Sequence, residues 1–219
     1  MLSRFMRFIF ILSTGIFLLS CTNETQQTEK DRDAVSFVHE YYKSIPFEYS
    51  ILEPGDFILR KGRGMVSDYI VGVLNEEIPV SHCGILVKSD GEWNVVHAIS
   101  KDGPDNSGVI EESLLTFIRE SLEGTLVIVR LKAEEDLRLS ISEQARELAT
   151  LNIPFDYSFN IEDNERMYCT EVVWSITTKV LGTDLFDERV KPGEVEILRF
   201  TNFFDEQKFE MVLNHFASL

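Results

Sequence analysis

Apolar and polar positions along the chain first indicate a β-hairpin near its centre. Two apolar-rich runs, 80–88 and 93–99, flank Ser89-Asp90-Gly91-Glu92. An Asp-Gly pair between two such runs is typical of a two-residue hairpin turn. Further strands are predicted where apolar and β-branched residues follow turn formers, at 57–59, 125–131 and 195–200.

Elsewhere apolar residues recur at a spacing of three to four, which predicts helices with one buried face. These helices are expected at 31–45, 65–74, 111–122, 135–151, 168–181 and 203–216. Together the predicted elements indicate an α+β fold, in which helices pack beside a mainly antiparallel sheet.

The first 20 residues have the composition of an export signal. Arg4 and Arg7 precede an apolar stretch that stops at Ser20 and is shorter than the roughly 20 apolar residues of a membrane span. Leu18-Leu19-Ser20-Cys21 resembles the bacterial lipobox, which implies cleavage before Cys21 and lipidation of that cysteine. The alternative is an ordinary signal peptide with a chance cysteine.

The sequence therefore predicts three parts. Residues 1–20 form the signal peptide, 21–33 hold the lipidated cysteine and a polar, flexible tether, and 34–219 form one domain. We expect an exported lipoprotein that is anchored to a membrane of the bacterial cell envelope and faces the periplasm or the cell surface.

The net charge limits the partners that this domain is expected to bind. The formal charge is −16, and it becomes two units more negative when Arg4 and Arg7 leave with the signal. Such a surface repels phosphate backbones, so nucleic acid is not an expected partner. It also repels anionic lipid headgroups, so the expected membrane attachment is the acylated Cys21.

The chain has three cysteines, at positions 21, 83 and 169. If Cys21 is acylated, Cys83 and Cys169 either form a disulfide or stay reduced. Cysteine and histidine spacings do not support a zinc site, and we expect no metal. Because Cys83 directly follows His82, its side chain is expected on the opposite sheet face, as a small core residue. A disulfide to Cys169 would then require that strand to be flipped.

Cys169 lies at the start of the helix predicted at 168–181. Unpaired backbone N–H groups and the helix dipole stabilise a thiolate at this position and lower the pKa of the thiol. The same N–H groups are suited to binding an oxyanion. The alternative is that Cys169 is a small buried apolar residue, as most free cysteines are.

The hairpin register brings two histidines together. A two-residue turn at Asp90-Gly91 places Ser89 opposite Glu92, and the numbers of facing residues then sum to 181. His82 and His97 become diagonal neighbours on the same sheet face. This arrangement provides a base for a thiol and a group that orients the base. The alternative is two hydrogen-bonded core histidines.

Five motifs follow one another along the chain: Pro54-Gly55-Asp56-Phe57-Ile58, Ser81-His82-Cys83-Gly84-Ile85, Val95-Val96-His97-Ala98, Pro154-Phe155-Asp156-Tyr157 and Tyr168-Cys169-Thr170-Glu171-Val172-Val173. In this order they resemble the YiiX-like branch of the permuted NlpC-type papain-like superfamily of cysteine hydrolases and amidases. The resemblance covers roughly residues 50–182, and each motif alone is weak. It implies a circularly permuted papain-like fold, in which the histidine precedes the cysteine.

The resemblance implies roles for three residues. Cys169 matches the nucleophile, His82 matches the general base, and His97 falls at the third polar position. Many YiiX-like chains carry Glu at that position, while other NlpC-type relatives carry His. An imidazole can accept the Nδ1–H of His82, but it compensates an imidazolium less well than a carboxylate does. We therefore expect a weaker thiolate–imidazolium pair unless another acid substitutes.

Four residues are expected to support the site or to bind substrate: Tyr168, Glu171, Asp56 and Ser81. Tyr168 is expected to line the pocket or to aim its backbone at the oxyanion. Glu171 is expected either to bond to the N-terminal region of the helix or to bind a cationic substrate group. Asp56 is expected to fix a turn or the site wall. The aromatic stretch 155–159 is expected to cover one side of the site, and the loop 101–108 to gate another.

The implied reaction is hydrolysis of an amide by a cysteine peptidase or amidase through an acyl-enzyme, with no cofactor. The lipid anchor favours an envelope substrate, either a peptidoglycan-type peptide or an N-acyl amide. Acidic residues beside the site would suit a free amine on a peptide substrate. Two alternatives stay open: a lipid amidase or acyltransferase on the same residues, and a non-catalytic envelope-binding lipoprotein.

Overall fold

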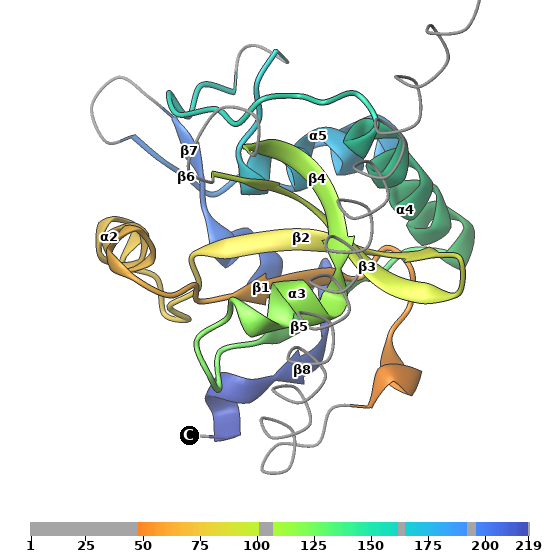
Figure 1. The fold of residues 1–219 in the computed structure, drawn as a ribbon, viewed down its shortest axis with the longest axis horizontal. Coiled ribbons are helices and arrows are strands. Elements are labelled where there is room, and N and C mark those ends of the chain that lie inside the picture. Colours follow the sequence, from red (N-terminus) through yellow and green to blue (C-terminus); the bar gives the residue numbers. More distant parts are fainter. Residues whose placement is uncertain (1–47, 101–106, 162–164, 192–195, 219) are drawn as a thin grey trace, which may run out of the picture.

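The computed structural model describes residues 48–100, 107–161, 165–191 and 196–218. The predicted signal peptide, Cys21, the tether and the helix expected at 31–45 lie outside these ranges. The central feature is one antiparallel sheet with the strand order β4-β3-β2-β1-β5-β8 (Figure 1). Its strands are β1 (Phe57–Arg60), β2 (His82–Ser89), β3 (Glu92–Ile99), β4 (Gly108–Ser113), β5 (Val127–Leu131) and β8 (Phe209–Asn214).

Helices cover both faces of this sheet, and each face has its own core. Helices α4 (Glu135–Ala149) and α5 (Cys169–Leu181) lie on one face, while the short α3 (Leu114–Arg119) lies on the other (Figure 1). The core between the sheet and α5 is the larger one, and it includes Cys83 and Ile85 of β2. The α3 side includes Leu86 of β2, because neighbouring residues of a strand point to opposite faces.

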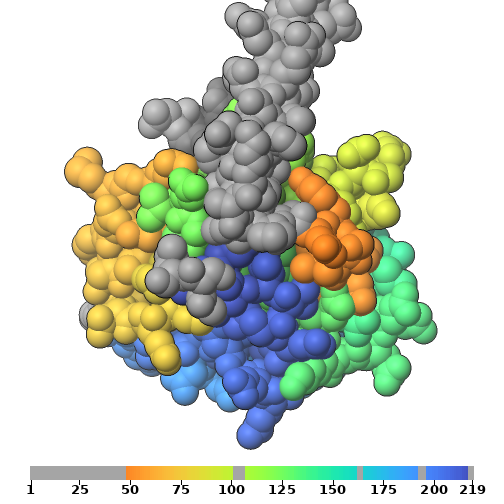
Figure 2. Space-filling model, turned by 90° about the horizontal axis from the view of Figure 1, so that it is seen from below, coloured from red at the N-terminus to blue at the C-terminus, as the bar shows by residue number. Residues whose placement is uncertain are grey.

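Several short elements complete the described chain. Helix α2 (Met65–Leu74) projects from the edge of the body, beside the start of β2 (Figure 1). The remaining elements are the two-stranded sheet of β6 (Arg189–Val190) and β7 (Ile197–Leu198) and the 3-10 turns η1 (Tyr49–Ile51), η3 (Phe200–Phe204) and η4 (His215–Ser218). The C-terminal part of the chain, blue in Figure 2, lies across the middle of the face seen from below. Within the described residues, no helix has the length and apolarity that a membrane crossing requires.

The predicted hairpin register is confirmed. The ladder between β2 and β3 runs from Ser89–Glu92 to Ile85–Val96, and each pair sums to 181. Asp90 has a φ of 52° and Gly91 a φ of 88°, as a two-residue type I′ turn requires. His82 and His97 lie beyond the last pair of this ladder, where the register still puts them on one face.

The helix predicted at 111–122 is wrong in its first three residues, which belong to a strand. Residues Gly108–Ser113 form β4, which pairs with β3 over its whole length. The helix begins only at Leu114, because the Ser113 hydroxyl caps it by accepting a hydrogen bond from the N–H of Thr116. Residues 111–113 pair with the edge of β3, and this backbone hydrogen bonding overrides the helix that their apolar spacing predicts.

The last predicted helix, 203–216, is also wrong. It is replaced by η3 and by β8, which pairs with β5 through an irregularity between Ile128 and Val129. The predicted strand at 195–200 is limited to the two residues of β7 among those described. The physical reason is the free edge of β5, which binds this segment through a backbone ladder that its local spacing does not reveal.

Asp56 has a structural position and does not belong to the site. Its fully buried carboxylate accepts two hydrogen bonds from Arg130, at 2.7 and 2.8 Å, and one from the N–H of Glu53. It precedes β1, whose far end carries Arg60 beside His82, so about 13 Å of strand separates it from the histidines. The structure thus places Asp56 in the turn before β1, at the end of the strand away from the two histidines.

We expect Arg130→Ala to lower the free energy of unfolding by roughly 3 kcal/mol, because it leaves the Asp56 carboxylate buried without its ion-pair partner. Burial already raises the pKa of Asp56, and Arg130 opposes that rise. Urea unfolding followed by circular dichroism measures the loss. The control is Lys208→Ala, which removes a 2.6 Å ion pair to the exposed Asp187 and is expected to cost less than about 1 kcal/mol. Equal losses in the two variants would contradict a structural role for the buried pair.

Candidate active site

Cys169 is the first residue of α5, as predicted, and Tyr168 occupies the N-cap position. The carboxylate of Glu171, at the third helical position, accepts a hydrogen bond of 3.2 Å from the Tyr168 N–H. Glu171 is fully buried, so it stabilises the start of the helix and is not open to a cationic substrate group. Of the two roles expected for Glu171, the structure therefore supports the one within the helix.

The surroundings of Cys169 favour its thiolate. A hydrogen bond with the Cys83 side chain is the largest cause that lowers the pKa of Cys169, and burial opposes it. Backbone N–H groups of Cys83, Thr170 and Cys169 itself lower this pKa further. Burial raises the pKa of Cys83 well above its usual value, so Cys83 keeps its proton and donates to the Cys169 sulfur.

This contact corrects the expected position of Cys83. The residue does point away from the face of His82, as the alternation of the strand requires, but α5 lies on the face that Cys83 occupies. The sulfur of Cys169 therefore meets Cys83 without any flip of the strand. Both cysteines are free thiols in the structure.

The two hairpin histidines are hydrogen-bonded to each other. Nε2 of His82 lies 2.7 Å from Nδ1 of His97, and the ring centroids are 4.9 Å apart. The bond thus uses Nε2 of His82, whereas Nδ1 was expected. Gly84 makes room for it, because a Cβ atom there would lie 3.0 Å from the His97 Cβ and 2.9 Å from the Val96 oxygen. The contact does not involve the other ring nitrogen of His82, Nδ1.

The histidine pair lies on the α3 side of the sheet, against Phe117. The Phe117 ring centroid is 5.7 Å from that of His82 and 5.3 Å from that of His97. Burial and then the charge of Arg60 lower the pKa of His82 well below its usual value. His82 is therefore neutral near pH 7, as a general base must be before it accepts a proton.

Arg60 is a buried cation that the sequence reasoning missed. It ends β1, opposite His82, and its guanidinium carbon lies 4.4 Å from the Phe117 ring centroid. Its NH1 group donates to the Phe117 carbonyl at 2.9 Å, and NH2 lies 3.5 Å from Glu120. Its charge acts on both Cys169 and His82, so it lies within electrostatic range of each of them.

Glu112 is the second residue that the sequence reasoning missed. Its carboxylate oxygen lies 3.0 Å from Nε2 of His97, and its side chain is only 10 % exposed. The residue was placed in a predicted helix, whereas β4 sets it opposite Val95 and on the same face as His97. Only an interpretation of 108–113 as a strand beside β3, with side chains alternating between the two faces, would have identified Glu112.

Ser81 and Tyr168 support the site without lying open to a substrate. The Ser81 hydroxyl lies 2.5 Å from that of Ser67 on α2 and accepts a hydrogen bond from the Gly62 N–H. The Tyr168 hydroxyl accepts a hydrogen bond from the N–H of Leu198, and burial raises the pKa of this phenol. Ser81 thus ties α2 to the residue before His82, and Tyr168 fixes the start of α5 against β7.

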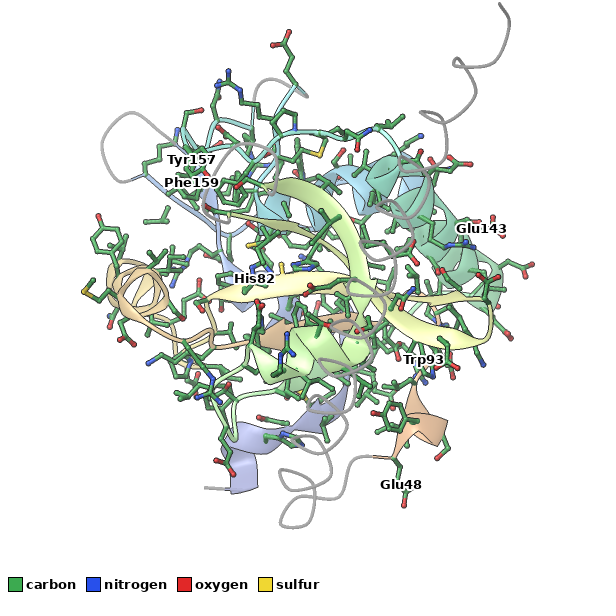
Figure 3. All side chains as sticks on the ribbon, viewed as in Figure 1. Glu48, His82, Trp93, Glu143, Tyr157 and Phe159 are labelled. Atoms are coloured by element: carbon green, nitrogen blue, oxygen red, sulfur yellow. The ribbon has the colours of Figure 1, made fainter. Side chains whose placement is uncertain are left out.

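The aromatic stretch 155–159 lies beside the start of α5, as expected. The ring centroid of Phe159 is 5.2 Å from that of Tyr168, while Tyr157 is 64 % exposed. Figure 3 shows Tyr157 and Phe159 near each other above the strand that carries His82. The Tyr157 hydroxyl accepts a hydrogen bond from Ser100, which follows β3. Most of the loop expected to gate the site, 101–106, lies outside the described residues.

The described residues contain no group of three or more histidine, cysteine or acidic side chains placed to hold a metal ion. A thiol at a helix start, beside a sheet that carries a hydrogen-bonded base, defines the papain-like class of thiol hydrolases. Residues 51–208 match the family model described as permuted papain-like amidase enzyme, YaeF/YiiX, C92 family. The chain belongs to this family of permuted papain-like cysteine amidases, which confirms the resemblance and the fold class.

Two similar proteins are known from Escherichia coli. The chain is 31 % identical over 134 residues to the uncharacterized protein YiiX of strain K12, and the match covers 59 % of each chain. The chain thus spans less than two thirds of that relative's length. A crystal structure titled metalloprotein yiiX, from strain O157:H7, has a TM-score of 0.61 at 22 % identity. It covers 74 % of this chain and 97 % of that one, which shows a shared fold.

We expect Cys83→Ala to raise the pKa of Cys169, because the variant removes the largest cause that lowers it. The rate of alkylation of Cys169 by iodoacetamide at pH 7, followed by peptide mass spectrometry, should fall about three- to tenfold. Cys83→Ser is the matched control, since its hydroxyl keeps a donor at the same place and should preserve most of the rate. A rate in Cys83→Ala that equals the rate of the unchanged protein would show that the Cys83 thiol does not stabilise the thiolate.

Proposed function

We propose that the protein is a cysteine amidase of the cell envelope. His82 takes the proton of Cys169 on Nδ1, and the thiolate attacks the carbonyl carbon of an amide. The backbone N–H groups at the start of α5 stabilise the oxyanion. The amine leaves with the proton from His82, and a thioester stays on Cys169. His82 then activates a water molecule, which releases the acid and restores the thiol.

One observation carries this proposal: the 2.7 Å contact between Nε2 of His82 and Nδ1 of His97. It orients the imidazole of His82, which directly precedes Cys83, the hydrogen-bond partner of Cys169. The charge of Arg60 acts on both His82 and Cys169, which supports their proximity. The polarised environment of Cys169 supports the same reading, because its pKa is lowered although burial raises it.

The envelope location rests on the sequence alone. Leu18-Leu19-Ser20-Cys21 supports lipidation of Cys21 and anchoring to a membrane. Residues 22–47 would join this anchor to the described domain. We propose that this attachment keeps the amidase at the membrane surface, where amide substrates include peptidoglycan peptides and N-acyl lipids.

The site favours an amide with an apolar acyl group over a peptide with a free amine. Glu171, for which a cationic substrate group was one expected partner, is buried within α5, and Asp56 lies at the far end of β1. Helix α2, by contrast, presents apolar side chains to solvent: Met65 is 88 % exposed, Val66 75 % and Tyr69 72 %.

These exposed side chains form one stripe on α2. Met65, Val66, Tyr69 and Val73 fall within an arc of about 100° on the helix. Such a stripe normally faces a core, and its exposure beside a site indicates an apolar ligand. Lys61 neutralises Asp68, the only charged residue of the helix, at 2.7 Å. The bond between Ser67 and Ser81 holds the opposite face of the helix against the residue before His82. We therefore assign the stripe to the distant part of a long acyl chain, beyond the bond that is cleaved.

The first experiment compares the protein with Cys169→Ala on isolated cell envelopes. Mass spectrometry of the soluble and lipid fractions should show a released fatty acid and its amine with the unchanged protein only. The mass of the mature N-terminus in the same preparation reports whether Cys21 is acylated. Release of cell-wall peptides in place of fatty acids would indicate a peptidoglycan peptidase. Identical fractions from the unchanged protein and from Cys169→Ala would refute the amidase proposal.

The second experiment tests the stripe on α2. We expect Val66→Asp with Tyr69→Asp to lower kcat/KM for a palmitoyl amide of aminomethylcoumarin by about tenfold, equivalent to roughly two buried methylene groups. The acetyl amide should be hydrolysed at an unchanged rate, since it does not reach the stripe. Leu151→Asp is the control, because Leu151 is 65 % exposed and follows α4. Equal effects on the long and the short amide would remove α2 from the substrate site.

A further inference from the structure

Glu112 completes a chain of three side chains that starts at the general base. Its oxygen lies 3.0 Å from Nε2 of His97, and Nδ1 of His97 lies 2.7 Å from Nε2 of His82. His97 is fully buried between the two. We propose that Glu112 is the acidic positioning residue of the site, which acts on the general base through His97. The proposal deepens the thiol-hydrolase function and rests on it.

The strands fix this arrangement. The β3–β4 ladder places His97 opposite Ile110 and Val95 opposite Glu112. Residues two apart on a strand share a face, so Glu112 and His97 are diagonal neighbours on the face that also carries His82. Glu111, one position earlier, points to the other face, where its carboxylate binds Ser89 and Asn94. Of these two acids, only Glu112 reaches the histidines.

The chain of contacts determines where each proton lies. A carboxylate 3.0 Å from Nε2 of His97 attracts the ring proton to that nitrogen, so that Nδ1 of His97 carries a lone pair. That lone pair accepts the proton on Nε2 of His82, and Nδ1 of His82 is then the unprotonated nitrogen. This is the only tautomer of His82 that can take a proton from Cys169 on Nδ1. Through His97, Glu112 thereby favours the tautomer of His82 whose Nδ1 is unprotonated.

The charge of Glu112 also supports the base after proton transfer. The cation Arg60 disfavours the imidazolium that forms on His82, and His97 brings no negative charge that would compensate it. Glu112 brings a negative charge to the far side of His97 and also acts on Arg60. Among the described residues, Glu120 is a further charged group near this cluster, and its carboxylate lies 3.5 Å from Arg60. A histidine and a glutamate together thus supply what one carboxylate at position 97 would supply.

The test uses alkylation of Cys169 by iodoacetamide between pH 5 and 9, which needs no substrate. Failure of the proposed amide substrate would therefore leave this test intact. Glu112→Gln keeps the shape and the acceptor oxygen but removes the charge. We expect the rate at pH 7 to fall about tenfold, and the rising limb of the pH profile to move up by about one unit. Glu111→Gln is the matched control on the same strand and should leave both unchanged.

A second experiment, in the His97→Glu variant, distinguishes a positioning role of Glu112 from a purely structural one. His97→Glu places a carboxylate directly beside His82, so the charge of Glu112 is no longer needed there and repels the new one. Adding Glu112→Gln to His97→Glu should leave the alkylation rate unchanged or raise it. An equal loss from Glu112→Gln in both backgrounds would overturn the proposal, since it would show a role independent of His97. Loss of the fold in Glu112→Gln, measured by circular dichroism, would overturn it as well.

Discussion

The register of the β2–β3 hairpin is the constraint on which the site depends. The two-residue turn at Asp90-Gly91 fixes which residues face each other, and a slip by one residue would move every side chain of a strand to the other face. In the observed register, both imidazoles lie on one face and Cys83 lies on the other. The base therefore meets its orienting partner on the α3 side, while the nucleophile meets its thiol donor on the α5 side. One turn thus sets two sets of contacts on opposite faces of the sheet.

Burial changes the pKa values of both reactive groups, Cys169 and His82, but only for Cys169 do hydrogen bonds reverse its effect. Burial raises the pKa of the Cys169 thiol, but hydrogen-bond donors around the sulfur outweigh it. For His82, burial and the charge of Arg60 act in the same direction, and both favour the neutral ring. The thiol is thus made easier to deprotonate while the base is kept unprotonated. The stronger acid and the available base are the two conditions that a thiol hydrolase requires.

Local sequence patterns predicted the register of the hairpin and the start of α5, which position the two histidines and Cys169. The turn residues gave the register, and the helix start at Cys169 followed from the spacing of its apolar residues. Patterns that depend on distant partners were misread: 108–113 and 209–214 became strands because β3 and β5 had free edges. Glu112 was missed for this reason. The position of Cys83 beside Cys169 was missed because the sequence does not state which face of the sheet a helix covers.

Gly84 limits how this sequence can change over evolutionary time. A Cβ atom at this position would meet Cγ1 of Val95 at 2.5 Å as well as the backbone of β3. The spacing His-x-Gly is therefore a steric requirement, since any larger residue would push apart the strands that hold the two imidazoles. Position 97 is fully buried against Phe117, so any other acceptor there must fit the same space. A lineage can therefore replace the third residue of the site only while position 84 stays without a side chain.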